Sequence, residues 1–243
     1  MKIKKHVPNL CTLGNLFCGT TATIFAVNQR FELTVSMVLL GVFLDFLDGF
    51  LARILSVSGA LGKQLDSLAD MVTSGVVPGI VMFNLLLSVN WEEDQFKDHS
   101  QLLCFIPFLG LVITMSACYR LAKFNLDTKQ SDFFVGLPTP AMSLFVVFLP
   151  IVQVNTGLIF IKEVIGNPYF LIGVLLFFSY LMNATFPMFS LKFKDYGIGE
   201  NSFRYALIVI SVILLGFMKY SAVPIIVIVY IFLSLLRNFS LKK

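Results

Sequence analysis

The sequence predicts an all-α polytopic membrane protein with about eight transmembrane helices. Of its 243 residues, 57% are hydrophobic and only 13% are charged, and the mean hydropathy is +0.87. A soluble domain of this length could not bury so much apolar surface, so the hydrocarbon of a bilayer must be its solvent. Two further observations agree: the apolar residues form runs of bilayer length, and Lys and Arg gather in alternate loops.

The apolar runs define the expected spans. They lie at about 9–27, 31–53, 64–88, 101–123, 136–155, 167–189, 203–218 and 221–236. A helix needs about 20 residues to cross the hydrocarbon, so the last two runs are short. Lys219 and Pro224 predict a tight hairpin between them. We expect residues 1–243 to form a single membrane domain, with the two spans of 203–236 peripheral to its core.

The distribution of positive charge predicts the orientation. With the N-terminus in the cytoplasm, only Arg30, Lys97, Lys162 and Lys219 of the 18 Lys and Arg residues fall in outer loops. Positive residues prefer the cytoplasmic side, so both termini are expected there. The same asymmetry accounts for the net charge of +4, and nucleic-acid binding is not expected.

Four aspartates interrupt two neighbouring spans within the stretch 45–70. Asp45 and Asp48 lie near the inner end of the second span, and Asp66 and Asp70 lie near the inner end of the third. At 1.5 Å per residue, both pairs lie roughly 5–12 Å below the cytoplasmic helix ends. Spacings of three and four residues place each pair on one helix face, so the two pairs can point at each other.

Four clustered carboxylates repel one another in a low dielectric, and two divalent cations would supply the compensating charge. Ligands that are all oxygen favour Mg²⁺, Mn²⁺ or Ca²⁺ over zinc. A pair of such ions is a recognised device for in-line displacement at phosphorus. The sequence therefore predicts a two-metal site on Asp45, Asp48, Asp66 and Asp70, served by Mg²⁺ or Mn²⁺, with Ca²⁺ as a further ion that could bind.

Small residues and one cation surround the aspartates. Gly49 and Ala52 lie within one turn of Asp48 and are expected to clear space for a bulky group. Gly62 is expected to let the third span begin close to the second. Arg53 offers a cation at the mouth that suits a phosphate. For the glycines alone, ordinary helix–helix contact is the alternative interpretation.

The spacing of these residues resembles the signature of the CDP-alcohol phosphotransferases. The pattern Asp-x2-Asp-Gly-x2-Ala-Arg-x8-Gly-x3-Asp-x3-Asp is met at every position by Asp45, Asp48, Gly49, Ala52, Arg53, Gly62, Asp66 and Asp70. Five stretches are similar to the bacterial phosphatidylserine synthases of that family: "PNLCTLGNLFCG" (8–19), "LDSLADMVTSGVVP" (65–78), "CYRLAKFN" (118–125), "FVGLPTPA" (134–141) and "SYLMNATFP" (179–187). Asn183 and Ala184 depart from the Val-Ser common there, and the last two spans carry no recognised motif.

The resemblance implies the fold of that family and a reaction. The phosphatidyl group of CDP-diacylglycerol would pass to the hydroxyl of L-serine, giving phosphatidylserine and CMP. Asp45, Asp48 and Asp66 resemble metal ligands, and Asp70 would complete the metal site and act as general base. The CDP-diacylglycerol pocket is implied at Asp48, Gly49, Ala52, Arg53, Gly62 and Asp66. The resemblance also implies a homodimer in the bacterial inner membrane, with its active site facing the cytoplasm.

The acceptor pocket is expected near the inner ends of the first and fourth spans. Arg120 could bind the serine carboxylate bidentately, with Lys123 nearby, while Asn15 and Asn125 offer carbonyl oxygens to the ammonium group. Glycerol 3-phosphate or inositol phosphate is the alternative acceptor, although either would suit a denser basic cluster. An ion-coupled transporter is a distant alternative, because it also uses intramembrane acids. Against it, the aspartates lie at one membrane face and no inverted repeat is visible.

Overall fold

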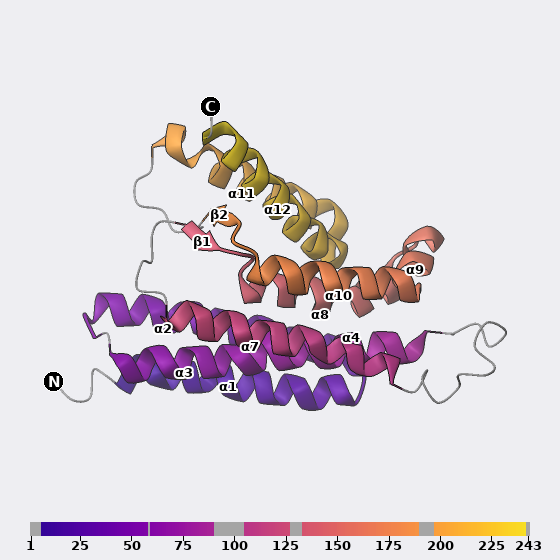
Figure 1. Cartoon of the computed structure of the whole chain (residues 1–243), viewed down its shortest axis with the longest axis horizontal. Coiled ribbons are helices and arrows are strands. Elements are labelled where there is room, and N and C mark those ends of the chain that lie inside the picture. Colours follow the sequence, from indigo (N-terminus) through magenta and orange to yellow (C-terminus); the bar gives the residue numbers. More distant parts are fainter. Residues whose placement is uncertain (1–5, 58, 90–104, 127–132, 190–196, 242–243) are drawn as a thin grey trace.

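The computed structural model describes the chain except for residues 1–5, 58, 90–104, 127–132, 190–196 and 242–243. The described residues form a helical molecule with one short two-stranded ribbon (Figure 1). The elements are, in order, α1 (His6–Val27), α2 (Phe31–Ile54), α3 (Ala60–Met71), η2 (Val72–Val76), α4 (Val77–Ser88), η4 (Ile106–Gly110), α7 (Leu111–Leu126), β1 (Phe133–Val135), α8 (Thr139–Asn155), α9 (Ile159–Ile165), α10 (Pro168–Asn183), β2 (Pro187–Phe189), α11 (Ile198–Met218), η5 (Lys219–Ser221) and α12 (Ala222–Leu241).

The helices α1, α2, α3–α4 and α7 form the layer that carries the aspartates. α1 packs against α2, α3 and α4, and α7 packs against α3 and α4. In Figure 1 these helices run side by side along the long axis of the molecule. The buried face of α1 includes Gly19, Ala22 and Ala26. Small residues on this face let neighbouring backbones approach closely, as is common between membrane helices.

The π-helical turn η2 joins α3 to α4 in one continuous helix, Ala60–Ser88, which contains the predicted span 64–88. This turn ends two residues before Pro78. A proline inside a helix removes one backbone donor, and its ring clashes with the carbonyl four residues earlier, here that of Ser74. The wider turn is a local adjustment that relieves this clash. It also places Thr73 inside the aspartate layer, where it is buried.

The helix α8 lies in the interior of the molecule. Every residue from Phe145 to Val152 is buried, and the helix packs against α2, α4 and α12. A helix that is apolar on all sides is stable only when other helices or lipid surround it. α8 thus joins the aspartate layer to the C-terminal helices.

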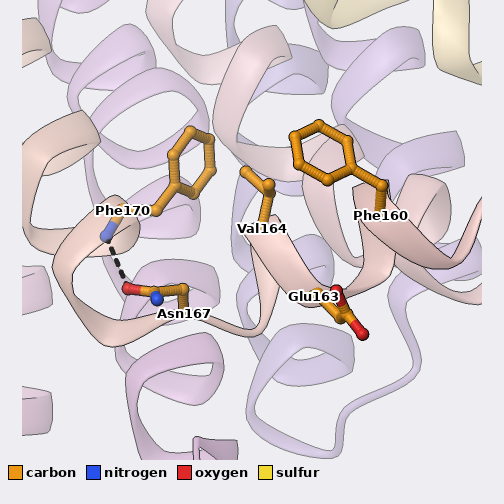
Figure 2. A pocket seen from close by; sticks show the side chains of 5 residues that line it. All are labelled: Phe160, Glu163, Val164, Asn167 and Phe170. Carbon is orange, nitrogen blue, oxygen red and sulfur yellow. Dashed lines mark hydrogen bonds between the residues drawn. The ribbon is translucent and has the colours of Figure 1, made fainter.

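The helices α9 and α10 meet at a bend of 65°. Asn167 caps α10 by accepting hydrogen bonds from the backbone N–H groups of Tyr169 and Phe170. Figure 2 shows the hollow of about 290 Å³ at this bend, which is lined by Phe160, Glu163, Val164, Asn167 and Phe170. None of these residues belongs to a helix that carries an aspartate of the motif.

The helices α11 and α12 form the predicted hairpin. The chain reverses at Lys219, whose positive φ of 50° ends α11, and α11 packs against α12. Figure 1 shows the two helices side by side, with the C-terminus near the start of α11. Pro224 lies in the first turn of α12, where a proline is tolerated because no intrahelical donor is lost. α12 also packs against α8 and β2.

The prediction of an all-α membrane protein is confirmed, whereas the count of eight spans is not. Five helical stretches are long and apolar enough to cross a membrane: His6–Val27, Phe31–Ile54, Ala60–Ser88, Ile106–Leu126 and Asn201–Asn238. The last of these contains the α11–α12 hairpin. The bent pair α9–α10 would make six, and α8 is a shorter apolar helix.

The predicted span 167–189 is wrong at its end. α10 stops at Asn183, and Pro187–Phe189 leave the helix to form β2, which pairs antiparallel with β1. The extended backbone of Ala184 and the nearby Pro187 end the helix, because the residue before a proline and the proline itself disfavour helical continuation. The hydrophobicity of this segment alone does not show the change of conformation.

Candidate active site

Three aspartates meet between α2 and α3. One carboxylate oxygen each from Asp45, Asp48 and Asp66 lies within 4.8 Å of the others. Asp48 is buried, and the other two are half-buried. The spacing of three residues places the α2 pair on one helix face, and the Asp66 carboxylate of α3 comes close to both of its members. The predicted meeting of the two acidic faces is thereby confirmed for these three residues.

Asp70 lies one turn beyond Asp66 on α3. Its Oδ1 accepts a hydrogen bond of 3.1 Å from Asn15 Nδ2 of α1. Its charge interacts repulsively with Asp66 and attractively with Arg120. Asp70 is not a member of the group of three that share the short oxygen–oxygen distances. Its roles as fourth metal ligand and as base therefore stay predictions.

The helix α1 holds one aspartate of each pair. Thr12 Oγ1 donates a hydrogen bond to Asp48 Oδ2, and Asn15 Nδ2 donates to Asp70. Thr12 and Asn15 are buried and three residues apart, so both face the α2–α3 pair. Sequence reasoning missed Thr12. The signal was present in part, because Thr12 and Asn15 are at helical spacing, on a face that otherwise carries Pro8, Cys18, Gly19, Ala22 and Ala26.

The donor set fits a hard divalent cation. The three converging ligands are all carboxylates, and within the described part of the chain no Lys or Arg forms an ion pair with them or with Asp70. Uncompensated carboxylates this close would repel one another strongly in a low dielectric. Asp45, Asp48 and Asp66 are therefore the residues that could hold a metal, and their oxygen atoms suit Mg²⁺, Mn²⁺ or Ca²⁺.

The small residues of the motif have different surroundings, and their roles in a substrate pocket stay predictions. A Cβ added at Gly49 would meet nothing within 4 Å, which agrees with an open space beside the aspartates. A Cβ added at Gly62 would lie 3.4 Å from Asn9 Oδ1, so Gly62 faces α1 rather than α2. Arg53 is exposed, and its Nε donates to the carbonyl of Gly49 at 2.9 Å. The place of Arg53 in a CDP-diacylglycerol pocket stays a prediction.

Arg120 of α7 is a buried cation that forms no ion pair with any residue that the structure describes. Its side chain is only 8% exposed, and Nη1 donates to Thr139 Oγ1 at 3.3 Å. Nε is buried and has no hydrogen-bond partner among the described residues. The guanidinium lies 6.0 Å from the ring centre of Phe124 and interacts electrostatically with Asp70 and Tyr230. A buried cation in this condition is costly unless a ligand completes its hydrogen bonds.

The remaining residues predicted for the acceptor pocket have other partners or lie at the rim. Asn125 Oδ1 accepts from Ser67 at 3.0 Å, and its Nδ2 donates to Gln64 at 3.4 Å, so Asn125 connects α7 to α3. The amide oxygen of Asn15 accepts from Thr73. Lys123 is exposed in the last turn of α7. As serine ligands, these three stay predictions.

The fold and the site define a class of protein: a helical membrane protein in which two apolar helices share a carboxylate cluster. The chain belongs to the CDP-alcohol phosphatidyltransferase family, whose model matches residues 5–186. This range contains every aspartate of the motif and ends before β2. The hairpin α11–α12 lies outside it, and the division of the chain into a core and peripheral spans stays a prediction.

Three relatives carry one name, CDP-diacylglycerol–serine O-phosphatidyltransferase. The protein of Bacillus subtilis is 32% identical over 148 residues, which are 59% of this chain and 75% of that protein. The protein of Helicobacter pylori is 27% identical over 191 residues, which are 75% of this chain and 72% of that protein. The protein of Saccharomyces cerevisiae is 32% identical over 173 residues, which are 64% of this chain and 56% of that protein.

Proposed function

We propose that this protein transfers the phosphatidyl group of CDP-diacylglycerol to the hydroxyl of L-serine, releasing phosphatidylserine and CMP. The family membership and the names of the relatives support the reaction class. The single observation that carries serine as acceptor is Arg120, a buried guanidinium whose Nε has no partner among the described residues. A free amino acid brings a carboxylate that this cation can bind bidentately.

The transfer is a substitution at the phosphorus of the phosphatidyl group. The serine hydroxyl oxygen forms the new bond to phosphorus, while the bond from phosphorus to the oxygen of CMP breaks and CMP leaves with the electron pair. Asp45, Asp48 and Asp66 would hold the divalent cations. When bound, such ions neutralise the diphosphate and stabilise the charge that develops on the departing CMP.

Asp70 is proposed as the general base. A base must lie within hydrogen-bond reach of the proton that it accepts, directly or through one water molecule. Asp70 lies on the same helix as Asp66 and is held by Asn15, so it adjoins the cluster of three carboxylates. Taking the proton from the serine hydroxyl raises the electron density on the oxygen that attacks phosphorus.

Arg120 is proposed to orient the acceptor. Its charge interacts with Asp70, which places the guanidinium within electrostatic range of the base. A serine whose hydroxyl reaches Asp70 can therefore present its carboxylate to Arg120. Thr139, at the start of α8, accepts a hydrogen bond from Nη1 of the same guanidinium and helps to hold it. Two anchored ends of one small molecule restrict its motion and raise the rate of the attack.

The proposed location is the bacterial inner membrane, with the aspartates near the cytoplasmic face and with the protein acting as a homodimer. The distribution of Lys and Arg supports the orientation. A cysteine introduced in the 92–98 loop should react with an impermeant thiol reagent from outside the cell, and one in the 126–131 loop should not. The opposite labelling pattern would overturn the orientation. Both loops include residues outside the described part of the structure.

The acceptor can be identified with purified protein in detergent micelles that contain CDP-diacylglycerol labelled in the cytidine. CMP release should depend on L-serine, and neither glycerol 3-phosphate nor inositol phosphate should replace it. D-serine is a useful control, since it offers the same charges in the wrong arrangement. Release of CMP with glycerol 3-phosphate but not with serine would contradict serine as the acceptor. Transfer of the phosphatidyl group to another alcohol would then be the remaining proposal. Movement of an ion with no CMP release would favour a transporter.

A further inference from the structure

A buried chain of hydrogen bonds runs from η2 through α1 to Asp70. Thr73 Oγ1 donates to Asn15 Oδ1 at 2.7 Å, and Asn15 Nδ2 donates to Asp70 Oδ1 at 3.1 Å. Asn15 and Thr73 are 0% and 1% exposed, so water does not compete for these bonds. We call this chain of two hydrogen bonds, Thr73 to Asn15 to Asp70, the relay.

The direction of the relay follows from the chemistry of its last member. An ionised carboxylate accepts hydrogen bonds and donates none, so the amide nitrogen of Asn15 must face Asp70. The amide oxygen of Asn15 then faces Thr73, and the Thr73 hydroxyl must be the donor. The Oδ1 and Nδ2 atoms of the Asn15 amide thereby each have a hydrogen-bond partner. These two partners together determine the orientation of the side chain.

The Thr73 hydroxyl bonds across helices, as those of Thr12 and Thr114 also do, and unlike those of three other threonines in the spans. The hydroxyls of Thr20, Thr23 and Thr34 each donate to the carbonyl four residues earlier in their own helix. Thr73 lies in the π-helical turn, and its hydroxyl instead crosses to α1, where the Asn15 backbone carbonyl lies 3.2 Å away and the Asn15 amide oxygen 2.7 Å away. The turn that accommodates Pro78 therefore also redirects this hydroxyl toward the site.

Two glycines make room for the relay. A Cβ added at Gly19 of α1 would overlap the Thr73 hydroxyl. A Cβ added at Gly41 of α2 would lie 2.9 Å from Asn15 Oδ1 and 2.9 Å from Thr73 Cγ2. Distances below 3.0 Å require the neighbouring atoms to move. Three helices therefore meet tightly at the relay, which leaves Asn15 and Thr73 little freedom to take other positions.

We propose that Asn15 and Thr73 are positioning residues that hold the Asp70 carboxylate in the orientation needed to accept the proton of the acceptor hydroxyl. This inference rests on the proposed function, because it takes Asp70 as the base. The bond from Asn15 occupies Oδ1, and Oδ2 has no hydrogen-bond partner among the described residues. Oδ2 is thus the oxygen left to accept the proton. A displacement of about 1 Å at a reacting group can cost about 100-fold in rate.

The first test removes the Thr73 hydroxyl and then restores it. Thr73→Val keeps the shape of the side chain, and kcat should fall about 10- to 100-fold while the KM for CDP-diacylglycerol changes by less than about twofold. Thr73→Ser keeps the hydroxyl and should retain kcat within about threefold. Thr23→Val is the matched control, because the Thr23 hydroxyl donates within α1 and does not contact the relay. Wild-type kcat in folded Thr73→Val would overturn the inference.

The second test asks whether the two residues act as one unit. Asn15→Leu should lower kcat, and adding Thr73→Val to it should cost little more, because the relay is already broken. If the two effects instead multiply, the residues act independently and the relay is not the cause. Gly41→Ala should lower kcat by crowding both members, whereas Gly173→Ala, whose Cβ would meet nothing within 4 Å, should not.

These outcomes separate the relay from the identity of the acceptor. The kinetic tests are run with whichever alcohol drives CMP release, since the base is needed for any of them. Absence of a serine-dependent reaction would contradict serine as the acceptor, and the relay could still be tested with another alcohol. If the wild-type reaction depends on serine and kcat is unchanged in folded Thr73→Val and Asn15→Leu, the role proposed for the relay is contradicted. The proposed function is then unaffected.

Discussion

The metal side and the acceptor side of the site are assembled in different ways. On the metal side, Asp45, Asp48 and Asp66 come from two helices that follow each other in the chain. On the acceptor side, Arg120 of α7 is surrounded by Thr139 at the start of α8 and by Tyr230 of α12. The first arrangement joins helices that are consecutive in the chain, and the second joins helices that are far apart in the sequence.

The two sides also carry opposite charges that the protein does not neutralise. The carboxylates meet no Lys or Arg ion pair in the described part of the chain, and neither does Arg120 meet an aspartate or glutamate. A buried charge without a counter-charge is unfavourable, so each side suits a ligand of the opposite sign. Under the proposed function, metal ions bind on one side and the acceptor carboxylate binds on the other. The following experiments test that division from the largest expected effect to the smallest.

Removal of the metal should have the largest effect. Chelation with EDTA should lower CMP release by about 1,000-fold or more, because bound cations contribute several kcal/mol to the stabilisation of charge in the transition state. Adding Mn²⁺ or Mg²⁺ should restore activity. Full activity in a preparation shown by elemental analysis to be free of metal would contradict the account of the acidic cluster.

Substitution of the proposed base should come next. Asp70→Asn should lower kcat by about 10²- to 10⁴-fold, the usual contribution of a general base. Binding of CDP-diacylglycerol should be largely retained, because Asp70 lies outside the group of three converging carboxylates. Asp48→Asn is the comparison, since it should weaken metal binding as well. Near-normal turnover in Asp70→Asn would exclude Asp70 as the base.

Arg120→Lys tests the acceptor side alone. The charge remains and the bidentate geometry is lost, so the KM for serine should rise about tenfold while the KM for CDP-diacylglycerol changes by less than about twofold. Arg53→Lys should show the reverse pattern, because Arg53, in the last turn of α2, is predicted to bind the diphosphate of CDP-diacylglycerol. Equal changes of both constants in Arg120→Lys would mean that Arg120 supports the fold and does not bind the acceptor.

Asn125→Ala should have the smallest effect on catalysis. Asn125 bonds Ser67 and Gln64 of α3, so its loss should lower the free energy of unfolding by about 1 kcal/mol. The KM for serine should rise by less than about threefold if this connection is its main role. A tenfold rise in that KM with unchanged thermal stability would instead place Asn125 in contact with serine, as the sequence predicted.

The sequence by itself determined the membrane class and the acidic cluster. Bilayer-length apolar runs predict membrane helices because lipid cannot satisfy the polar groups of an open backbone. The spacings within 45–70 predict one acidic face on each of two helices, because helical periodicity is a local property of the chain. The metal side could be predicted for this reason, and the structure confirms that Asp45, Asp48 and Asp66 meet.

Only the tertiary structure decided which helix each remaining residue faces. The Cβ position of Gly62 points toward Asn9 of α1, whereas the sequence predicted that Gly62 lets α3 begin close to α2. Thr12 reaches Asp48, and the hydroxyl of Thr73 reaches Asn15, because packing brings residues 36 and 58 positions apart into contact. Such contacts depend on the rotation of one helix against another. Sequence periodicity defines the faces of each helix, and the packing of side chains between helices selects their partners.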